Sequence, residues 1–202
     1  MYSYLYSFIQ KLILKKSLNS DAASLLKLLK IKNVIDIGCG DSDVLNYYKF
    51  EKNQKYFGYE TEGYFINKLK KKFKEKHLLF FKKNINDIDF DKFNPKNSLI
   101  LMIGVLHHLD DLSIKKFLSK TKEFKILSID AVILPNQSFI TKFLYYLDRG
   151  NYIRYLNDYK KLLVNFNYKL IHNRYLRLPY DHVMFFKNIK KTNINNLIDN
   201  NK

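Results

Sequence analysis

Residues 34–45 read VIDIGCGDSDVL, and this stretch decides the fold of the chain. A short apolar strand, predicted over 33–37, runs directly into GCG at 38–40 and then into a segment that predicts a helix over about 42–48. Glycine lets the backbone turn tightly and approach a ligand, because no side chain intervenes. The pattern is typical of α/β domains that bind nucleotide-like ligands, but the two glycines alone do not identify the ligand.

Strands and helices alternate along the rest of the sequence. This alternation predicts an open, mostly parallel sheet covered on both faces. The expected strands cover about 56–59, 77–82, 98–103 and 124–131, the helices about 20–30, 62–74, 111–121, 136–147 and 156–165, and an antiparallel pair lies near 168–176 and 182–187. The expected fold class is a Rossmann-like, doubly wound α/β domain with an antiparallel C-terminal strand pair. Ligands of such sheets bind outside the carboxyl ends of the strands.

The sequence shows no internal repeat and no interdomain linker. Residues 1–190 are therefore expected to form a single domain, and the polar, Asn-rich residues 191–202 a flexible tail. Within the domain, residues 1–30 predict two helices over the ligand cleft. The first, over 2–18, places apolar residues at helical spacing among lysines, so a peripheral membrane contact is an alternative.

The start of the chain and its cysteine content favour a cytoplasmic location. Residues 1–16 lack the order of charge, apolar stretch and small residues that marks a secretory signal. No apolar run reaches the roughly 18 residues of a membrane span. The one cysteine, Cys39, has no partner for an internal disulfide, which fits a reducing compartment.

The net charge of +17 suggests nucleic acid or an anionic membrane as a partner. Much of this charge is lysine in a sequence also rich in Asn, Ile, Phe and Tyr, which is the composition of an AT-rich genome. Arginine is scarce, and its four copies lie near the C-terminal end, at 149, 154, 174 and 177. We therefore expect lysine on solvated faces and no nucleic-acid partner, and we regard the arginines as the better indication of an anion site.

Acidic residues around the glycine turn separate two classes of ligand. Glu60 ends the next predicted strand, where a carboxylate can accept both hydroxyl hydrogens of an adenosine ribose. The turn itself continues into Asp41 and Asp43, and carboxylates there would repel the pyrophosphate of a dinucleotide. S-adenosylmethionine carries no phosphate, and its ammonium and sulfonium groups tolerate an acidic loop. The loop therefore favours S-adenosylmethionine over NAD.

Two motifs carry a family resemblance. VIDIGCGDSDVL resembles motif I of the class I S-adenosylmethionine-dependent methyltransferases, and MIGVLHHLDD, at 102–111, resembles the fourth-strand motif of their small-molecule branch. The resemblance covers about residues 33–131. It implies S-adenosylmethionine as the cofactor, with Ser42 in place of the last glycine of motif I.

The resemblance assigns cofactor contacts by position. It places the methionine part on the turn after the first strand, the ribose on the acid that ends the second, the adenine after the third and the sulfonium after the fourth. The residues so implied are Asp36, Gly38, Cys39, Gly40, Glu60, Asn84, Ile85, Ile103 and Gly104. Cys39 occupies a packing position in the family, and Asn84 stands where the branch usually has an Asp.

Three residues are candidates for the general base that a hydroxyl acceptor requires. His107 and His108 follow the fourth strand beside the expected methyl position, and Asp130 ends the fifth strand, facing the mouth of the cleft. The alternative for the two histidines is that they cap the strand and bond to the backbone. Asp110 and Asp111 fit the N-cap of the next helix better than a catalytic role. No metal site is expected.

The segment LDRGNYIRYLNDYKKLL, at 147–163, resembles an element that follows strand five in a group of bacterial small-molecule methyltransferases. The acceptor contacts expected there are Asp148, Arg149, Tyr152, Arg154 and Tyr159. Arginine could bind a carboxylate or phosphate of the acceptor in a bidentate manner. The structural alternative is a helix end with an Asp148–Arg149 ion pair and a stop at Gly150.

The expected activity is methyl transfer from S-adenosylmethionine to a hydroxyl or amine of a small or carrier-linked molecule, such as a sugar or lipid intermediate. One alternative is a nucleic-acid (RNA) methyltransferase, although the sequence has no Asn/Asp-Pro-Pro-Tyr/Phe motif for flipped bases. The other is a non-catalytic domain that binds S-adenosylmethionine. The acceptor and the oligomeric state stay open.

Overall fold

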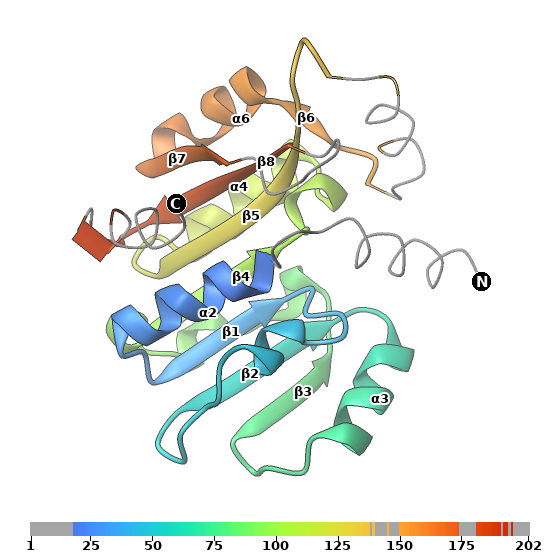
Figure 1. Cartoon of the computed structure of the whole chain (residues 1–202), viewed down its shortest axis with the longest axis vertical. Helices are drawn as coiled ribbons and strands as arrows, with labels where there is room; N and C mark the ends of the chain where they lie inside the picture. Colours follow the sequence, from blue (N-terminus) through green and yellow to red (C-terminus); the bar gives the residue numbers. More distant parts are fainter. Residues whose placement is uncertain are drawn as a thin grey trace.

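An eight-stranded sheet organises the computed structural model, which describes residues 18–137, 139, 145, 150–173, 181–190, 192, 193 and 195 (Figure 1). The strands are β1 (Asn33–Ile37), β2 (Lys55–Glu60), β3 (Leu78–Lys82), β4 (Ser98–Ile103), β5 (Lys125–Ile133), β6 (Arg154–Tyr155), β7 (Tyr168–Asn173) and β8 (Asp181–Lys187). Their order is β3-β2-β1-β4-β5-β8-β7, and β6 pairs with the end of β5. Strands β1 to β5 are parallel, whereas β8 is antiparallel to both β5 and β7. The Rossmann-like sheet with its antiparallel C-terminal pair is confirmed.

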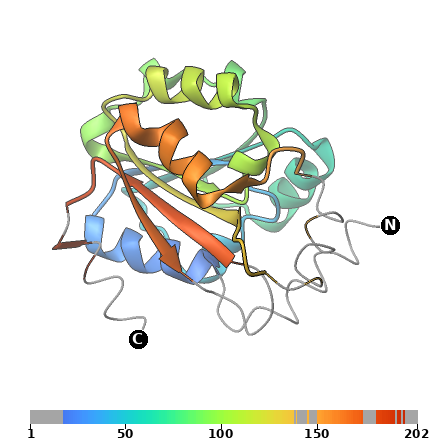
Figure 2. The same ribbon diagram turned by 90° about the horizontal axis from the view of Figure 1, so that it is seen from above.

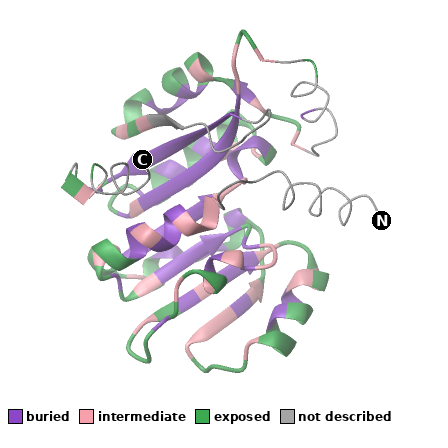
Figure 3. Ribbon diagram, in the orientation of Figure 1, coloured by how far each residue is buried: buried purple, intermediate pink, exposed green. Residues whose placement is uncertain are grey.

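Helices cover both faces of this sheet (Figure 2). On one face lie α2 (Leu18–Leu29) and α3 (Gly63–Lys72), whose apolar residues join one core cluster with β1, β4 and β5. On the other face lie α4 (Asp111–Lys120) and α6 (Leu156–Leu163), which pack into a second cluster. The central strands are buried as a result (Figure 3), which explains why they read as nearly continuous apolar runs.

The connection from β1 to β2 contains less helix than the sequence predicted. A single 3-10 turn, Asp43–Asn46, replaces the expected helix over 42–48. The residue before it, Ser42, has a left-handed backbone (φ 53°) and gives the turn no side-chain cap. The turn thus begins without the side-chain cap that favours an α-helix at its first residue.

Other expected elements differ in place or lie outside the described residues. Helix α2 packs on a face of the sheet, with Ala22 and Leu25 fully buried. The expected helix over 2–18 falls on residues that the structure does not describe, apart from Leu18 itself. The same holds for most of the expected helix over 136–147 and of the tail over 191–202. None of the described helices combines the length and apolar composition needed to cross a bilayer.

Candidate functional site

The turn after β1 is fixed to the end of β2. The amides of Gly38 and Cys39 both donate to the carbonyl oxygen of Tyr59, over 2.8 and 3.1 Å. Gly38 and Gly40 have left-handed backbones, with φ of 65° and 50°. A Cβ on Gly38 would lie 2.7 Å from a methyl group of Val105, whereas one on Gly40 would meet no atom within 4 Å. Gly38 is therefore needed for packing, and Gly40 leaves open space on the outer side of the turn.

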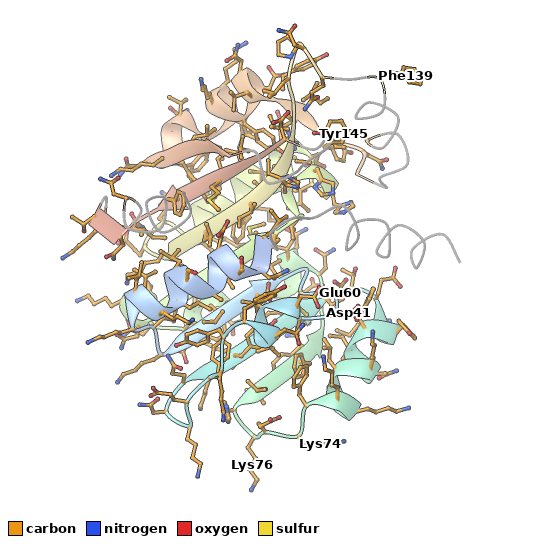
Figure 4. The ribbon with its side chains drawn as sticks, in the orientation of Figure 1. Asp41, Glu60, Lys74, Lys76, Phe139 and Tyr145 are labelled. Carbon is orange, nitrogen blue, oxygen red and sulfur yellow. The ribbon has the colours of Figure 1, made fainter. Side chains whose placement is uncertain are left out.

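Glu60 lies against this turn, as the sequence predicted. Its Oε2 accepts the Gly40 amide over 3.1 Å, and its Oε1 accepts the amides of Thr61 and Glu62. Asp41 lies nearby at the same sheet edge (Figure 4) and forms an ion pair of 2.7 Å with Lys68. The carboxyl ends of β1 and β2 thus form an acidic edge with open backbone at Gly40.

A buried hydrogen-bonded chain supports the turn from below. The Tyr56 hydroxyl lies 2.6 Å from Asp36 Oδ2 and 3.0 Å from Ser42 Oγ. Burial raises the pKa of Asp36 to about 7, the hydrogen bond from Tyr56 opposes that rise, and the charge of Glu60 adds to it. Ser42, which stands in place of a motif I glycine, is thus bonded in its left-handed conformation by a tyrosine that the sequence analysis did not identify.

Cys39 is a packing residue, as the resemblance implied. Its side chain is buried, and a Cβ on Gly58 would lie 3.0 Å from its sulfur. Burial, with the nearby charge of Asp36, raises the pKa of the thiol far above its ordinary value. The thiolate form that a nucleophile requires is therefore not available here.

The residues expected near the adenine and the sulfonium lie at the same edge of the sheet. Asn84 is exposed, and its side-chain oxygen caps the 3-10 turn Ile85–Asp87 by accepting the Asn86 amide. Ile85 itself is buried. Gly104 directly follows Ile103 at the end of β4, has a φ of 69° and donates its amide to Ile129.

His107 and Asp130 form a buried pair beyond the end of β4. Nδ1 of His107 lies 2.5 Å from Oδ1 of Asp130, which also accepts the Ala131 amide. The other oxygen of Asp130 accepts the amides of Val105 and Leu106. Asp130 is fully buried, so the prediction that it faces the mouth of the cleft is wrong. Its carboxylate is committed to orienting the imidazole and the loop that carries it.

The His107 imidazole lies beside the expected methyl position. A Cβ on Gly104 would lie 3.8 Å from His107 Cε1, and the side chain of His107 is about as buried as the core around it. His108 is exposed, and its ring centroid lies 4.1 Å from that of His107. The structure thus distinguishes one buried imidazole, bonded to Asp130, from one exposed imidazole beside it.

Asp110 begins helix α4, as the alternative reading of HHLDD predicted. Its side chain accepts the Ser113 amide over 2.6 Å, and that hydrogen bond lowers the pKa of the carboxyl. Asp110 therefore has a structural function.

The guanidinium of Arg154, predicted to contact the acceptor, is bonded to groups of the protein itself. It donates from Nε to Asp111, from Nη1 to the carbonyls of Leu106 and Tyr152, and from Nη2 to that of Leu109. Nη2 also forms an ion pair of 2.7 Å with Asp111. Arg154 is buried and links the segment before β6 to the loop that carries the histidines.

The other residues expected to bind the acceptor have three different positions. Tyr159 is fully buried, packs its ring against Phe185 and donates its hydroxyl to Ala131, so it belongs to the core and the prediction for it is wrong. Tyr152 is exposed over 42% of its surface. Asp148 and Arg149 lie outside the described residues.

No metal centre is formed by the residues that the structure describes, since no three of their His, Cys, Asp and Glu side chains gather in one place. The acidic edge, the glycine turn and the His107–Asp130 pair are therefore the chemistry that the described part of the site offers.

Comparison with known proteins identifies the core of this chain. Residues 35–132 match the family model described as a methyltransferase domain. No curated protein matches the chain in sequence.

Solved structures share the fold at low identity. Human N-acetylserotonin methyltransferase, solved with S-adenosylmethionine, is 16% identical, with a TM-score of 0.59 over 85% of this chain and 52% of that one. The mitomycin 7-O-methyltransferase MmcR is 16% identical, with a TM-score of 0.61 over 84% and 52%. A protein described as a pericyclic reaction enzyme is 12% identical, with a TM-score of 0.60 over 81% and 46%.

This chain spans about half the length of those solved proteins. The match of residues 35–132, the strand order and the turn after β1 agree with one another. Residues 35–132 are therefore similar to a methyltransferase domain, and the chain shares the Rossmann-like fold of these solved methyltransferases.

Proposed function

We propose that the chain binds S-adenosylmethionine at the carboxyl ends of β1, β2 and β4 and transfers its methyl group to a hydroxyl of a small or carrier-linked molecule. The observation that carries the proposal is the hydrogen bond between Glu60 and the Gly40 amide, which joins the ends of β1 and β2 into one acidic edge. The names of two similar solved structures, an N-acetylserotonin and a mitomycin 7-O-methyltransferase, support a small acceptor.

The residues at this edge fit the cofactor chemically. Among the described residues, Glu60 Oε2 accepts one hydrogen bond, which leaves it a lone-pair direction for a ribose hydroxyl. The open side of Gly40 lets a ligand approach the backbone closely. Asp36 and Asp41 favour a cationic ligand over a pyrophosphate. Bound here, S-adenosylmethionine would supply an electrophilic methyl group on a sulfonium.

His107 is the residue that we assign as general base. The carboxylate of Asp130 accepts hydrogen bonds from three backbone amides. It can also accept a hydrogen bond from a protonated Nδ1 of His107. If Nδ1 carries the proton, Nε2 has the lone pair that takes the proton of an acceptor hydroxyl. His108 is exposed, in contrast to the buried His107, and it serves as the comparison residue.

Titration calorimetry with S-adenosylhomocysteine and with NAD tests the cofactor assignment. We expect binding of S-adenosylhomocysteine and none of NAD, and we expect Glu60→Ala to weaken binding by about 1–3 kcal/mol, the usual scale for hydrogen bonds to a charged group. Glu62→Ala is the matched control, because Glu62 is exposed and contributes only its backbone amide. Binding of NAD without a response to S-adenosylhomocysteine would refute the assignment.

The fold alone does not fix the reaction, since a pericyclic reaction enzyme shares it. A panel of phenols, sugars and hydroxylated lipids, incubated with S-adenosylmethionine, separates the possibilities by the release of S-adenosylhomocysteine. Release that depends on one class of hydroxyl supports methyl transfer. Cofactor binding without release from any acceptor supports a binding domain.

We also expect no tight binding of RNA, despite the net charge of +17. Lys74 and Lys76 precede β3 and lie at the bottom of the molecule in Figure 4, away from Asp41 and Glu60. Genuine phosphate contacts make affinity fall by about one log unit per log of salt for each contact. Measurement of RNA binding between low and physiological salt checks this, and tight, steeply salt-dependent binding would favour a nucleic-acid substrate.

A further inference from the structure

Gly150 lies directly against the imidazole of His107. A Cβ built on Gly150 would come within 2.0 Å of His107 Cδ2 and 3.1 Å of its Nε2. The backbone of Gly150 is not left-handed, so its conformation does not require glycine. The contact with His107 is therefore the reason that a side chain does not fit here, because real Cβ atoms do not approach other atoms so closely.

The residues after Gly150 attach the same segment to the histidine loop. The amide of Tyr152 donates to the carbonyl of His107 over 2.9 Å. Arg154 then donates to the carbonyls of Leu106 and Leu109, which lie on either side of the two histidines. The backbone on both sides of the imidazole is thus bonded to residues that follow β5 by about twenty positions.

Three groups on two elements fix the imidazole. Asp130, on β5, bonds its Nδ1, and Gly150 lies against the ring carbon Cδ2. Arg154 fixes the loop that carries the imidazole through four hydrogen bonds and an ion pair. A ring with one nitrogen bonded and one edge in contact has little freedom to rotate, so the direction of Nε2 is set by these contacts.

We propose that Gly150 and Arg154 are positioning residues that set the direction of His107 Nε2 toward the acceptor. This inference rests on the proposed function, in which the imidazole of His107 is the general base. Neither residue touches a reacting atom. Through their contacts, the segment after β5 holds the imidazole in one orientation. Orientation matters because a displacement of about 1 Å at a reacting group can cost about 100-fold in rate.

Gly150→Ala tests the contact, with Gly63→Ala as its matched control. Gly63 begins α3, where a Cβ would meet the Lys82 side chain at an ordinary 3.5 Å. With the acceptor that the hydroxyl panel identifies, we expect kcat of Gly150→Ala to fall about 100-fold while the dissociation constant of S-adenosylhomocysteine changes less than about twofold. Gly63→Ala should match the wild type in both. Wild-type kcat in Gly150→Ala would overturn the proposal.

Nitrogen NMR of the imidazoles tests the same contact without any acceptor. The chain has five histidines, and the loss of a signal in His107→Gln assigns His107. We expect the His107 Nδ1 proton to exchange about tenfold faster in Gly150→Ala, as for a local opening made ~1.4 kcal/mol easier. Gly150→Ala should lower the melting temperature of the wild-type protein, and it should not lower that of the His107→Ala variant. A penalty that persists without the imidazole would refute the contact.

Two substitutions separate the carbonyl contacts of Arg154 from its ion pair. Asp111→Asn keeps an oxygen acceptor at a site where the carboxylate is 62% exposed, so we expect kcat to change less than about twofold. Arg154→Lys keeps the charge but has one nitrogen, which cannot reach the carbonyls of Leu106 and Leu109 as a planar fork does. We expect kcat to fall about tenfold, a loss of ~1.4 kcal/mol, with an unchanged KM for S-adenosylmethionine. If Arg154→Lys has the same kcat as Asp111→Asn, Arg154 has no positioning function.

These measurements separate failure of the inference from failure of the proposed function. Without methyl transfer to any hydroxyl, the proposed function fails, and the NMR and melting experiments still decide whether Gly150 orients the imidazole. With methyl transfer that does not depend on Gly150 or Arg154, the proposed function stands and the inference is wrong.

Discussion

Replacing His107 with glutamine is expected to lower kcat by about 100- to 10,000-fold, the range that a positioned general base contributes. Glutamine is of similar size and polarity but cannot accept a proton at neutral pH. The reason to expect the loss at His107 is its bond to Asp130, a buried carboxylate that also accepts three backbone amides. The rate is measured as release of S-adenosylhomocysteine with the hydroxyl acceptor.

The control variant is His108→Gln, since the two imidazoles are neighbours with different exposure. If His107 is the base, this variant retains most of the wild-type rate, and both variants bind S-adenosylhomocysteine as the wild type does. An acidic nitrophenol, which reaches the site already ionised, should also reduce the deficit of His107→Gln. Loss of turnover in His108→Gln alone would assign the base to the exposed ring.

Replacing Asp36 with asparagine is expected to change stability and cofactor binding in opposite directions. Burial raises the pKa of Asp36 from 3.8 to about 7, so the folded chain binds its proton more tightly than the unfolded chain does. The stability that this group contributes is therefore complete below pH 4 and is lost as the pH rises towards 7. Three pKa units correspond to about 4 kcal/mol, the upper limit of what Asp36→Asn recovers above pH 7.

Urea unfolding at pH 5 and pH 8 measures this effect. We expect Asp36→Asn to unfold at higher urea than the wild type at pH 8, with a smaller difference between the two pH values. Asparagine still offers Tyr56 an oxygen acceptor, so the buried chain to Ser42 persists. Binding of S-adenosylhomocysteine should weaken by about 1–3 kcal/mol, because a charged acceptor has been lost. The same pH dependence in both proteins would show that Asp36 does not titrate in this range.

Local signals allowed the sheet and the turn after β1 to be predicted from the sequence. The apolar run 33–37, the glycines at 38 and 40 and the acid at 60 are each defined by a few neighbouring residues. The structure brings them together because the carboxyl ends of parallel neighbours meet at one edge. The short 3-10 turn after Ser42 was missed, because the left-handed serine depends on Tyr56, which belongs to another strand.

The acceptor residues could not be predicted in the same way. Arginine and tyrosine have the same chemical capacity in a pocket as in the core, and only the tertiary contacts decide which use is made of it. Arg154 meets three carbonyls and a carboxylate, and Tyr159 lies beneath β5 against Phe185. Asp130 was expected to end β5, but the strand continues to Ile133, and the carboxylate is buried near Tyr159 of α6.

The contact between Gly150 and His107 also has an evolutionary consequence. A glycine whose conformation is ordinary is free to mutate unless a neighbour forbids a side chain, and here the neighbour is one imidazole. Among homologues, loss of the histidine should therefore remove the constraint on the glycine, so that the two positions vary together although they lie far apart in the sequence. Paired substitution at positions 107 and 150 in an alignment of homologues would indicate the contact independently of the structure.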